Sequence, residues 1–262
     1  MSGASLSKTM RSSILITFIL SIGIGVAFPF RPANLLDGAI PSISKIDVSL
    51  HCLSNESIEG ARRSGSINSL AAACDHELRT VLDSDFGDVD DEVIRIVLAT
   101  IVAANFANYG VSSAISFDGI RQSKDLNCGN TILLAGYLFG TLESSKIRPI
   151  GFDGGDVGNH SQLLYLGEHE TILLDPTTGL VAQTDFNDLL RGVPVSENKI
   201  RSFAIKDKTI ETFRQKVYLA VRDGEYEPSD FMYMHKTLAE LATEGMLSRY
   251  FSPGAINAAA GR

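Results

Sequence analysis

The stretch KDLNCGNTILLAGYLFG, residues 124–140, places a cysteine where a polar loop turns into an apolar, helix-like run. Asn127 is a good helix-capping residue, so the sequence predicts that Cys128 lies at a helix N-terminus. Unpaired N–H groups and the helix dipole stabilise an anion there, which suits a nucleophilic thiolate. The alternative is that Cys128 is a small buried hydrophobic residue, the common role of a cysteine.

A thiol that attacks an acyl carbon needs a base to remove its proton and a third group to orient that base. His160 is the favoured base. Segments 161–166 and 170–175 have the pattern of strands, and the Gly-Glu pair between them suits a two-residue hairpin loop of type II′. This register places His160 directly opposite Asp175, with Cβ atoms roughly 4.5–5.5 Å apart. Asp175 then fixes the tautomer of the imidazole.

The remaining histidines are His51, His76, His169 and His235. The first two lie beside Cys52 and Cys74, but these separations match no zinc-binding pattern. The third falls in a turn that we expect to be solvated, and the fourth lies in an amphipathic helix. The sequence therefore predicts no metal site and no other cofactor.

Three runs of the chain, CGNTILLAGYLFG, IRPIGFDGGDVGNHSQLLYL and TILLDPTTG, resemble the transglutaminase-like superfamily of cysteine enzymes. That pattern has Cys at a helix start, His on one strand and Asp on the next, often before Pro. Here the intervals are 32 and 15 residues, and the resemblance covers about residues 120–180. It implies that Cys128 is the nucleophile, His160 the base and Asp175 the orienting group. Many members have an aromatic residue where this chain has Ser161, and this chain has no tryptophan.

Gln122 lies six residues before Cys128, a separation similar to that of the oxyanion-hole glutamine in papain-like peptidases. The bacteriocin-processing peptidases share a "Q…CG" start and an "H…DP…G" finish, although their Cys-to-His interval is generally much longer. Both resemblances imply a papain-like architecture in which Gln122 helps to bind a developing oxyanion. A solvated loop residue is the alternative for Gln122.

Periodicity predicts helices at 66–86, 89–110, 129–142, 209–224 and 229–251. A strand at 147–152 precedes the hairpin, with a polar loop at 110–127 and a glycine-rich turn at 153–159. Helices first and strands after them predict an α+β fold, with a helical N-terminal half packed on a small antiparallel sheet and C-terminal helices. With the resemblance, the core is expected to be papain-like or transglutaminase-like. The domain spans residues 46–252, and 253–262 form a tail.

The N-terminus has the pattern of an export segment. Residues 1–11 carry Lys8 and Arg11, and residues 12–30 are uncharged and mostly apolar. This run is a cleaved signal peptide or a membrane anchor, with a buried core helix as the alternative. In either of the first two cases the basic flank stays in the cytoplasm, and the rest is periplasmic, extracellular or membrane-anchored. Residues 31–45 have the composition of a linker.

Export favours disulfide formation, and the chain has three cysteines. Cys52 and Cys74 lie in the same N-terminal third and form the expected pair, which leaves Cys128 as the free thiol. The alternative is that the first two are both reduced and buried.

The composition limits the partners. The 262 residues carry a formal charge of −8 and show no extended basic cluster, which disfavours nucleic acid. The sequence therefore predicts an exported cysteine hydrolase or acyltransferase (a peptidase, amidase or transglutaminase) that acts on a peptide, a protein or a cell-envelope polymer. The alternative from another class is an inactive envelope-binding or assembly module of the same fold.

Overall fold

The structure is a computed structural model that describes residues 42–87, 89–154, 157–168, 170–225 and 237–243. Its helices and turns of 3-10 helix are η1 (Ile43–Lys45), α1 (Asn55–Ser64), α2 (Asn68–Phe86), α3 (Asp91–Ala104), α4 (Phe117–Gln122), α5 (Cys128–Phe139), α6 (Phe186–Leu190), η2 (Glu197–Lys199), η3 (Lys208–Ile210), α7 (Glu211–Asp223) and α8 (Leu238–Thr243). Its strands are β1 (Asp47–Val48), β2 (Asn108–Tyr109), β3 (Asp125–Leu126), β4 (Ile147–Gly154), β5 (Gly158–Leu166), β6 (Thr171–Asp175), β7 (Leu180–Thr184) and β8 (Ile200–Phe203).

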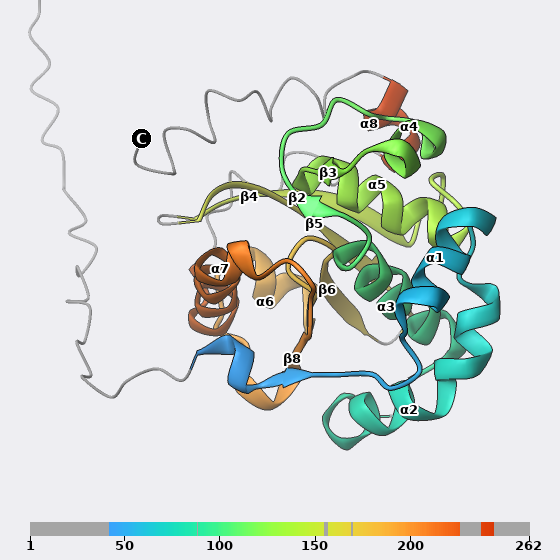
Figure 1. The fold of residues 1–262 in the computed structure, drawn as a ribbon. Coiled ribbons are helices and arrows are strands. Elements are labelled where there is room, and N and C mark those ends of the chain that lie inside the picture. Colours follow the sequence, from blue (N-terminus) through green and yellow to red (C-terminus); the bar gives the residue numbers. More distant parts are fainter. Residues whose placement is uncertain (1–41, 88, 155–156, 169, 226–236, 244–262) are drawn as a thin grey trace, which may run out of the picture. The chain divides into compact units, whose positions relative to one another are not determined.

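The main sheet has six strands in the order β1-β8-β7-β6-β5-β4 (Figure 1). The pairs from β8 to β4 are antiparallel, and β1 joins β8 in parallel. Helices precede most of this sheet in the chain, so the predicted α+β class is confirmed. The sequence did not predict β1, β7 or β8. The prediction of a purely antiparallel sheet is also wrong, because β1 pairs with β8 in parallel.

Each face of the sheet packs against its own layer of helices, as the ribbon shows (Figure 1). On β5, Leu163 and Tyr165 belong to the core formed with α2, α3 and α5. Leu164, between them, belongs to a second core with α6 and α7. This alternation buries both faces of the second half of β5 and explains why residues 163–166 are a continuous apolar run.

Helix α3 begins where the sequence predicted but ends earlier. The Asp90 carboxylate accepts the Val93 N–H at 2.7 Å and caps the first turn. Asn105 ends the helix, because its side-chain amide donates to the Ile101 carbonyl at 3.0 Å. The predicted extension to Gly110 is therefore wrong. The predicted polar loop that follows also contains α4 and β3.

Helix α5 begins at Cys128, as predicted. The Asn127 side chain accepts the Asn130 N–H at 2.9 Å, and the Asn130 side chain accepts the Asn127 N–H at 3.1 Å. This reciprocal capping satisfies amide groups that a helix start otherwise leaves unpaired. It also fixes the cysteine at the first helical position.

The predicted register of the β5–β6 hairpin is wrong by two residues. Leu164 pairs with Leu173 rather than with Thr171. The cause is the turn, which spans four residues and is closed by a bond from the Gly167 N–H to the Glu170 carbonyl. A shift of two residues keeps every side chain on its predicted face, whereas a shift of one would reverse them all.

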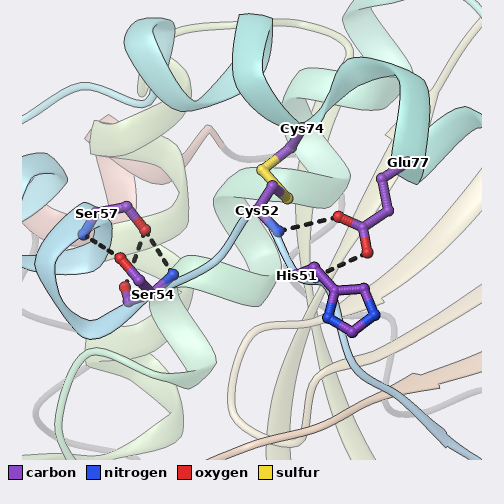
Figure 2. Close-up of a disulfide and its surroundings, with 6 residues drawn as sticks. All are labelled: His51, Cys52, Ser54, Ser57, Cys74 and Glu77. Carbon is purple, nitrogen blue, oxygen red and sulfur yellow. Dashed lines mark hydrogen bonds between the residues drawn. A yellow bond between two sulfur atoms is a disulfide. The ribbon is translucent and has the colours of Figure 1, made fainter.

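Cys52 and Cys74 form the predicted disulfide, which joins the segment before α1 to α2 (Figure 2). The Glu77 carboxylate accepts the backbone N–H groups of His51 and Cys52 at 2.7 and 3.0 Å. These two bonds lower the pKa of Glu77, against the smaller opposing effect of burial. Beyond the disulfide, Ser54 and Ser57 form the capping box of α1.

Several expectations fall outside the described residues: the segments 1–11 and 12–30, most of the linker, the tail, and two of the histidines, His169 and His235. Residues 43–45 of the expected linker form η1 and bury Ile43. Among the described helices, none combines the length and the apolar character that crossing a membrane requires.

Candidate active site

His160 and Asp175 meet in the interior of the protein. The His160 Nε2 atom lies 2.7 Å from the Asp175 Oδ2 atom, and both side chains are fully buried. Because of the register shift, the two residues are diagonal neighbours across β5 and β6 rather than a directly opposed pair. Diagonal neighbours on one face are still within reach of a histidine side chain. The predicted contact is therefore confirmed although the predicted opposition is wrong.

The Asp175 carboxylate accepts four hydrogen bonds. Its Oδ2 also accepts the side-chain amide of Gln162 at 3.1 Å. Its Oδ1 accepts the backbone N–H groups of Thr177 and Thr178 at 2.9 and 3.0 Å, which is the turn chemistry of the DPTTG segment. These bonds hold the carboxylate in one orientation, and the carboxylate in turn orients the imidazole.

The electrostatics favour a charged pair. Burial alone would lower the pKa of His160, but the Asp175 carboxylate and, less strongly, Cys128 outweigh it and raise that pKa to about 10. Burial would raise the pKa of Asp175, but the imidazolium, Gln162 and the Thr178 N–H lower it. The pair is therefore imidazolium and carboxylate at neutral pH.

Cys128 lies close to the same imidazole. Its side chain is only 1% exposed and makes no disulfide. The buried Nδ1 atom of His160 has no well-formed hydrogen bond within the described residues, yet Cys128 is close enough to help raise the pKa of the ring. The site thus holds the thiol beside a nitrogen that is otherwise unpaired.

The first turn of α5 is tied to the loop that carries Asp175. The Thr131 hydroxyl donates to the Cys128 carbonyl at 2.9 Å and lies 2.8 Å from the Thr177 hydroxyl. Thr177 also donates its backbone N–H to Asp175. This chain of contacts sets the distance between the helix that carries the thiol and the strand that carries the carboxylate.

Two aromatic side chains cover the site. The Phe213 ring, from α7, packs edge-on against the His160 imidazole with centroids 4.9 Å apart, and it stacks on Tyr109 at 5.9 Å. Burial first, then the charges of Cys128 and Asp175, raise the pKa of Tyr109, and its hydroxyl interacts with the Cys128 side chain. The sulfur is therefore closed in by Tyr109 on one side and by His160 on another.

Helix α7 is held in place by a buried arginine next to Phe213. Arg214 forms a paired contact with Asp47 at 2.7 and 3.0 Å and donates to the Thr178 carbonyl at 2.9 Å. Since Thr178 also donates to Asp175, the arginine links the aromatic cover to the carboxylate loop.

Sequence reasoning missed Gln162, Tyr109 and Phe213 as members of this site. Gln162 stands two residues from His160 on the same strand face, which is a usable signal. The other two residues reach the site from β2 and α7, and no local pattern indicates either contact.

Gln122, the fourth predicted site residue, lies elsewhere. It is exposed at the end of α4 and lines a cavity whose walls contain none of Cys128, His160 or Asp175. The structure thus brings together three of the four predicted residues.

No group of three or more possible metal ligands occurs in the part of the chain that the structure describes. Cys52 and Cys74 form a disulfide, so their sulfur atoms do not serve as thiolate ligands of a metal.

Comparison of the chain with protein-family models, with curated proteins and with solved structures gives no match. Any assignment of function therefore depends on the geometry of the site itself.

Proposed function

We propose that the protein is an exported cysteine enzyme of the transglutaminase-like type, in which Cys128, His160 and Asp175 act as a triad. One observation carries the proposal. The Nε2 of a buried histidine is held at 2.7 Å by a buried carboxylate, while its unpaired Nδ1 remains for a thiol at a helix N-terminus. A nucleophile, a base and an orienting group in this order are what acyl transfer requires.

The chemistry follows from the proton inventory. In the proposed cycle the thiol proton of Cys128 is transferred to His160 Nδ1, and the sulfur attacks the carbonyl carbon of an amide or ester. The His160 Nδ1 proton then passes to the leaving nitrogen or oxygen, and a thioester remains on the cysteine. Water or an amine attacks the thioester, with His160 accepting its proton, and the thiol is released. Water makes the enzyme a peptidase or amidase, and an amine makes it a transglutaminase.

The papain-like core belongs to this proposal. Its support is the order of elements, with a cysteine at the start of α5, the histidine on β5 and the aspartate at the end of β6. The aromatic residue that many transglutaminase-like proteins carry after the histidine is replaced here by Ser161. Phe213 from α7 supplies an aromatic ring against the imidazole instead.

Export is supported by the disulfide as well as by the uncharged N-terminal run, because disulfides persist in oxidising compartments. The substrate class is then a peptide, a protein or a cell-envelope polymer outside the cytoplasm. Residues 12–30 anchor the protein to the membrane if they are not cleaved.

A second candidate, a binding or assembly module without catalysis, is favoured by a specific observation. Cys128 and His160 are each only 1% exposed, so a substrate carbonyl reaches the sulfur only if the Tyr109–Phe213 cover moves.

Labelling with iodoacetamide separates the two candidates. We expect the native protein at pH 7 to be alkylated at Cys128 faster than the urea-unfolded protein, as located by peptide mass spectrometry, with Cys128→Ala as the blank. Slower labelling of the native protein would favour the binding module. A Phe213→Leu variant, which opens the cover while keeping an apolar residue, then tests access. If this variant is also slower than the unfolded protein, the enzyme proposal is wrong.

A further inference from the structure

A cavity of about 350 Å³ lies apart from the triad, at the end of α3. Its walls come from α1, from the segment between α3 and the start of β2, from the end of α4 and the two residues after it, and from the loop after β8. The lining includes Arg62, Asn105, Asn108, Gln122, Lys124 and Lys206. This volume is at the lower end of the range for small-molecule sites, so it suits a small ligand or one end of a larger one.

The cavity is positively charged although the protein is acidic. Three of its lining residues are cationic and none is acidic, in a chain with 31 acidic and 23 basic residues. The neighbouring carboxylate of Asp207 is occupied, because it accepts the Tyr109 N–H at 2.8 Å and both the N–H and the hydroxyl of Thr209. The lining itself therefore carries an excess of positive charge, which the nearby Asp207 carboxylate and the Glu59 contact of Arg62 at 3.4 Å offset only in part.

The walls are held together before any ligand binds. The Asn105 side chain accepts the Lys206 N–H at 3.0 Å and donates to the Ala204 carbonyl at 3.2 Å. The Arg62 guanidinium donates to the Phe106 carbonyl and lies 4.1 Å from the centre of the Phe106 ring. Such preorganisation lowers the cost of ordering a site on binding.

Two of the carbonyl groups near the end of α3 are already hydrogen-bonded. The Asn105 N–H bonds the Val102 carbonyl, and the Phe106 N–H bonds the Ala103 carbonyl. The donors available to a ligand include the exposed side chains of Lys124, Lys206 and Gln122. Within the described ranges these three side chains make no hydrogen bond or ion pair.

We propose that this cavity is a binding site for a small anionic ligand whose charged group is a carboxylate or a phosphate. Lys124 and Lys206 supply the charge, and the Gln122 amide supplies a directional donor. Arg62 adds a third positive charge to the lining, and its guanidinium is held by the carbonyl groups of Phe106 and Arg121. The proposal is independent of the chemistry of Cys128.

The site is next to the aromatic cover of the triad. A second, much smaller cavity shares Ala107 and Asn108 with the first, and it reaches Tyr109 and Thr131. An anion bound in the larger cavity would therefore lie against the same segment that carries Tyr109.

The test is isothermal titration calorimetry of the full-length protein with inorganic phosphate in one arm and succinate in the other, at constant ionic strength. We expect at least one probe to bind. The double variant Lys124→Ala, Lys206→Ala should weaken that probe by at least about tenfold. The matched control, Lys45→Ala with Lys199→Ala, removes the same charge from exposed positions outside the cavity and should leave the affinity unchanged.

The outcomes are distinct. Binding of phosphate alone identifies a phosphorylated ligand, binding of succinate alone identifies a carboxylate ligand, and both support the site. Failure of both probes to bind the native protein overturns the proposal. An equal loss in the control variant also overturns it, because the binding would then follow net charge rather than the cavity. A circular dichroism spectrum like that of the native protein confirms that each variant is folded.

Discussion

Cys74 and Cys128 are both buried, at 0% and 1% exposure, yet they lie in opposite chemical settings. Cys74 is bonded to Cys52 and surrounded by the apolar helical core. Cys128 is free, lies at a helix start and borders a charged imidazole. Burial alone therefore does not distinguish a disulfide-bonded cysteine from a free thiol beside an imidazole; the neighbouring groups differ.

Each of these two regions contains a carboxylate, and the two carboxylates also differ in what they hold in place. Glu77 accepts backbone N–H groups beside the disulfide and so fixes the path of the chain. Asp175 is fully buried and accepts a histidine side chain, so it fixes the orientation of a group that can move a proton. We expect changes near the disulfide to alter stability and changes near Cys128 to alter reactivity.

The largest effect is expected for Asp175→Asn. Asparagine keeps the size of the side chain but removes the charge that holds the imidazolium, so the rate of Cys128 alkylation should fall by roughly 10²–10⁴-fold. A time course of iodoacetamide labelling, quenched at intervals and read by peptide mass spectrometry, measures this rate. Asp185→Asn is the matched control, because Asp185 caps α6 and asparagine caps equally well. A loss below about tenfold, or an equal loss in the control, would contradict the role of Asp175.

The disulfide should give the opposite result. Replacing both Cys52 and Cys74 by alanine removes a cross-link between residues 22 apart, which should lower the free energy of unfolding by roughly 3 kcal/mol. Urea denaturation measures the loss. The alkylation rate of Cys128 in the folded variant should stay within about twofold of that of the native protein. A fall comparable to that of the Asp175 variant would show that the two regions are not separable.

How much of the site the sequence could predict depends on the range of each interaction. The capping of α5 was predictable because Asn127 and Asn130 act within one turn of Cys128. The contact between His160 and Asp175 was also predictable, and it survived a wrong register because the error was two residues and not one. Local rules thus located Cys128, His160 and Asp175 in the sequence.

Contacts between distant elements could not be predicted. Phe213 reaches His160 from a helix 53 residues further along the chain, and its own local pattern indicates only an amphipathic helix. The turn after β5 was misjudged because a glycine in the first loop position suits more than one loop length. Gln122 lies away from Cys128 because it ends α4, a short helix in a stretch whose composition predicted only a loop.

The pH dependence of stability should reveal the charged pair of His160 and Asp175. The pKa of His160 is raised from an ordinary value of 6.5 to about 10 in the folded protein. Its contribution to stability is therefore complete below about pH 6.5 and is lost as the pH rises towards 10. In a Cys128→Ser background, which removes the thiol titration, stability should fall more steeply over this range than in the same background with His160→Gln. Thermal unfolding at pH 6.5 and pH 10 measures the difference, and equal slopes would contradict the charged pair.

The smallest effect is expected for Glu77→Gln beside the disulfide. Glutamine keeps one acceptor oxygen, so the variant should lose no more than about 1 kcal/mol in the free energy of unfolding at pH 7. The pKa of Glu77 is lowered in the folded protein, so its advantage over glutamine is present above its ordinary value of 4.5 and is lost as the pH falls. Urea denaturation at pH 7 and pH 3.5 should therefore show a gap between native protein and variant that closes at the lower pH.

The control for this change is Glu143→Gln, at an exposed position where the described residues offer the carboxylate no hydrogen bond. Its stability should match that of the native protein at both pH values. A gap for Glu77→Gln that persists at pH 3.5 would mean that the side chain acts through packing rather than charge. If Glu77→Gln also changed the alkylation rate of Cys128, the Glu77 carboxylate would be coupled to the thiol as Asp175 is. The disulfide region and the Cys128 region would then not be separable.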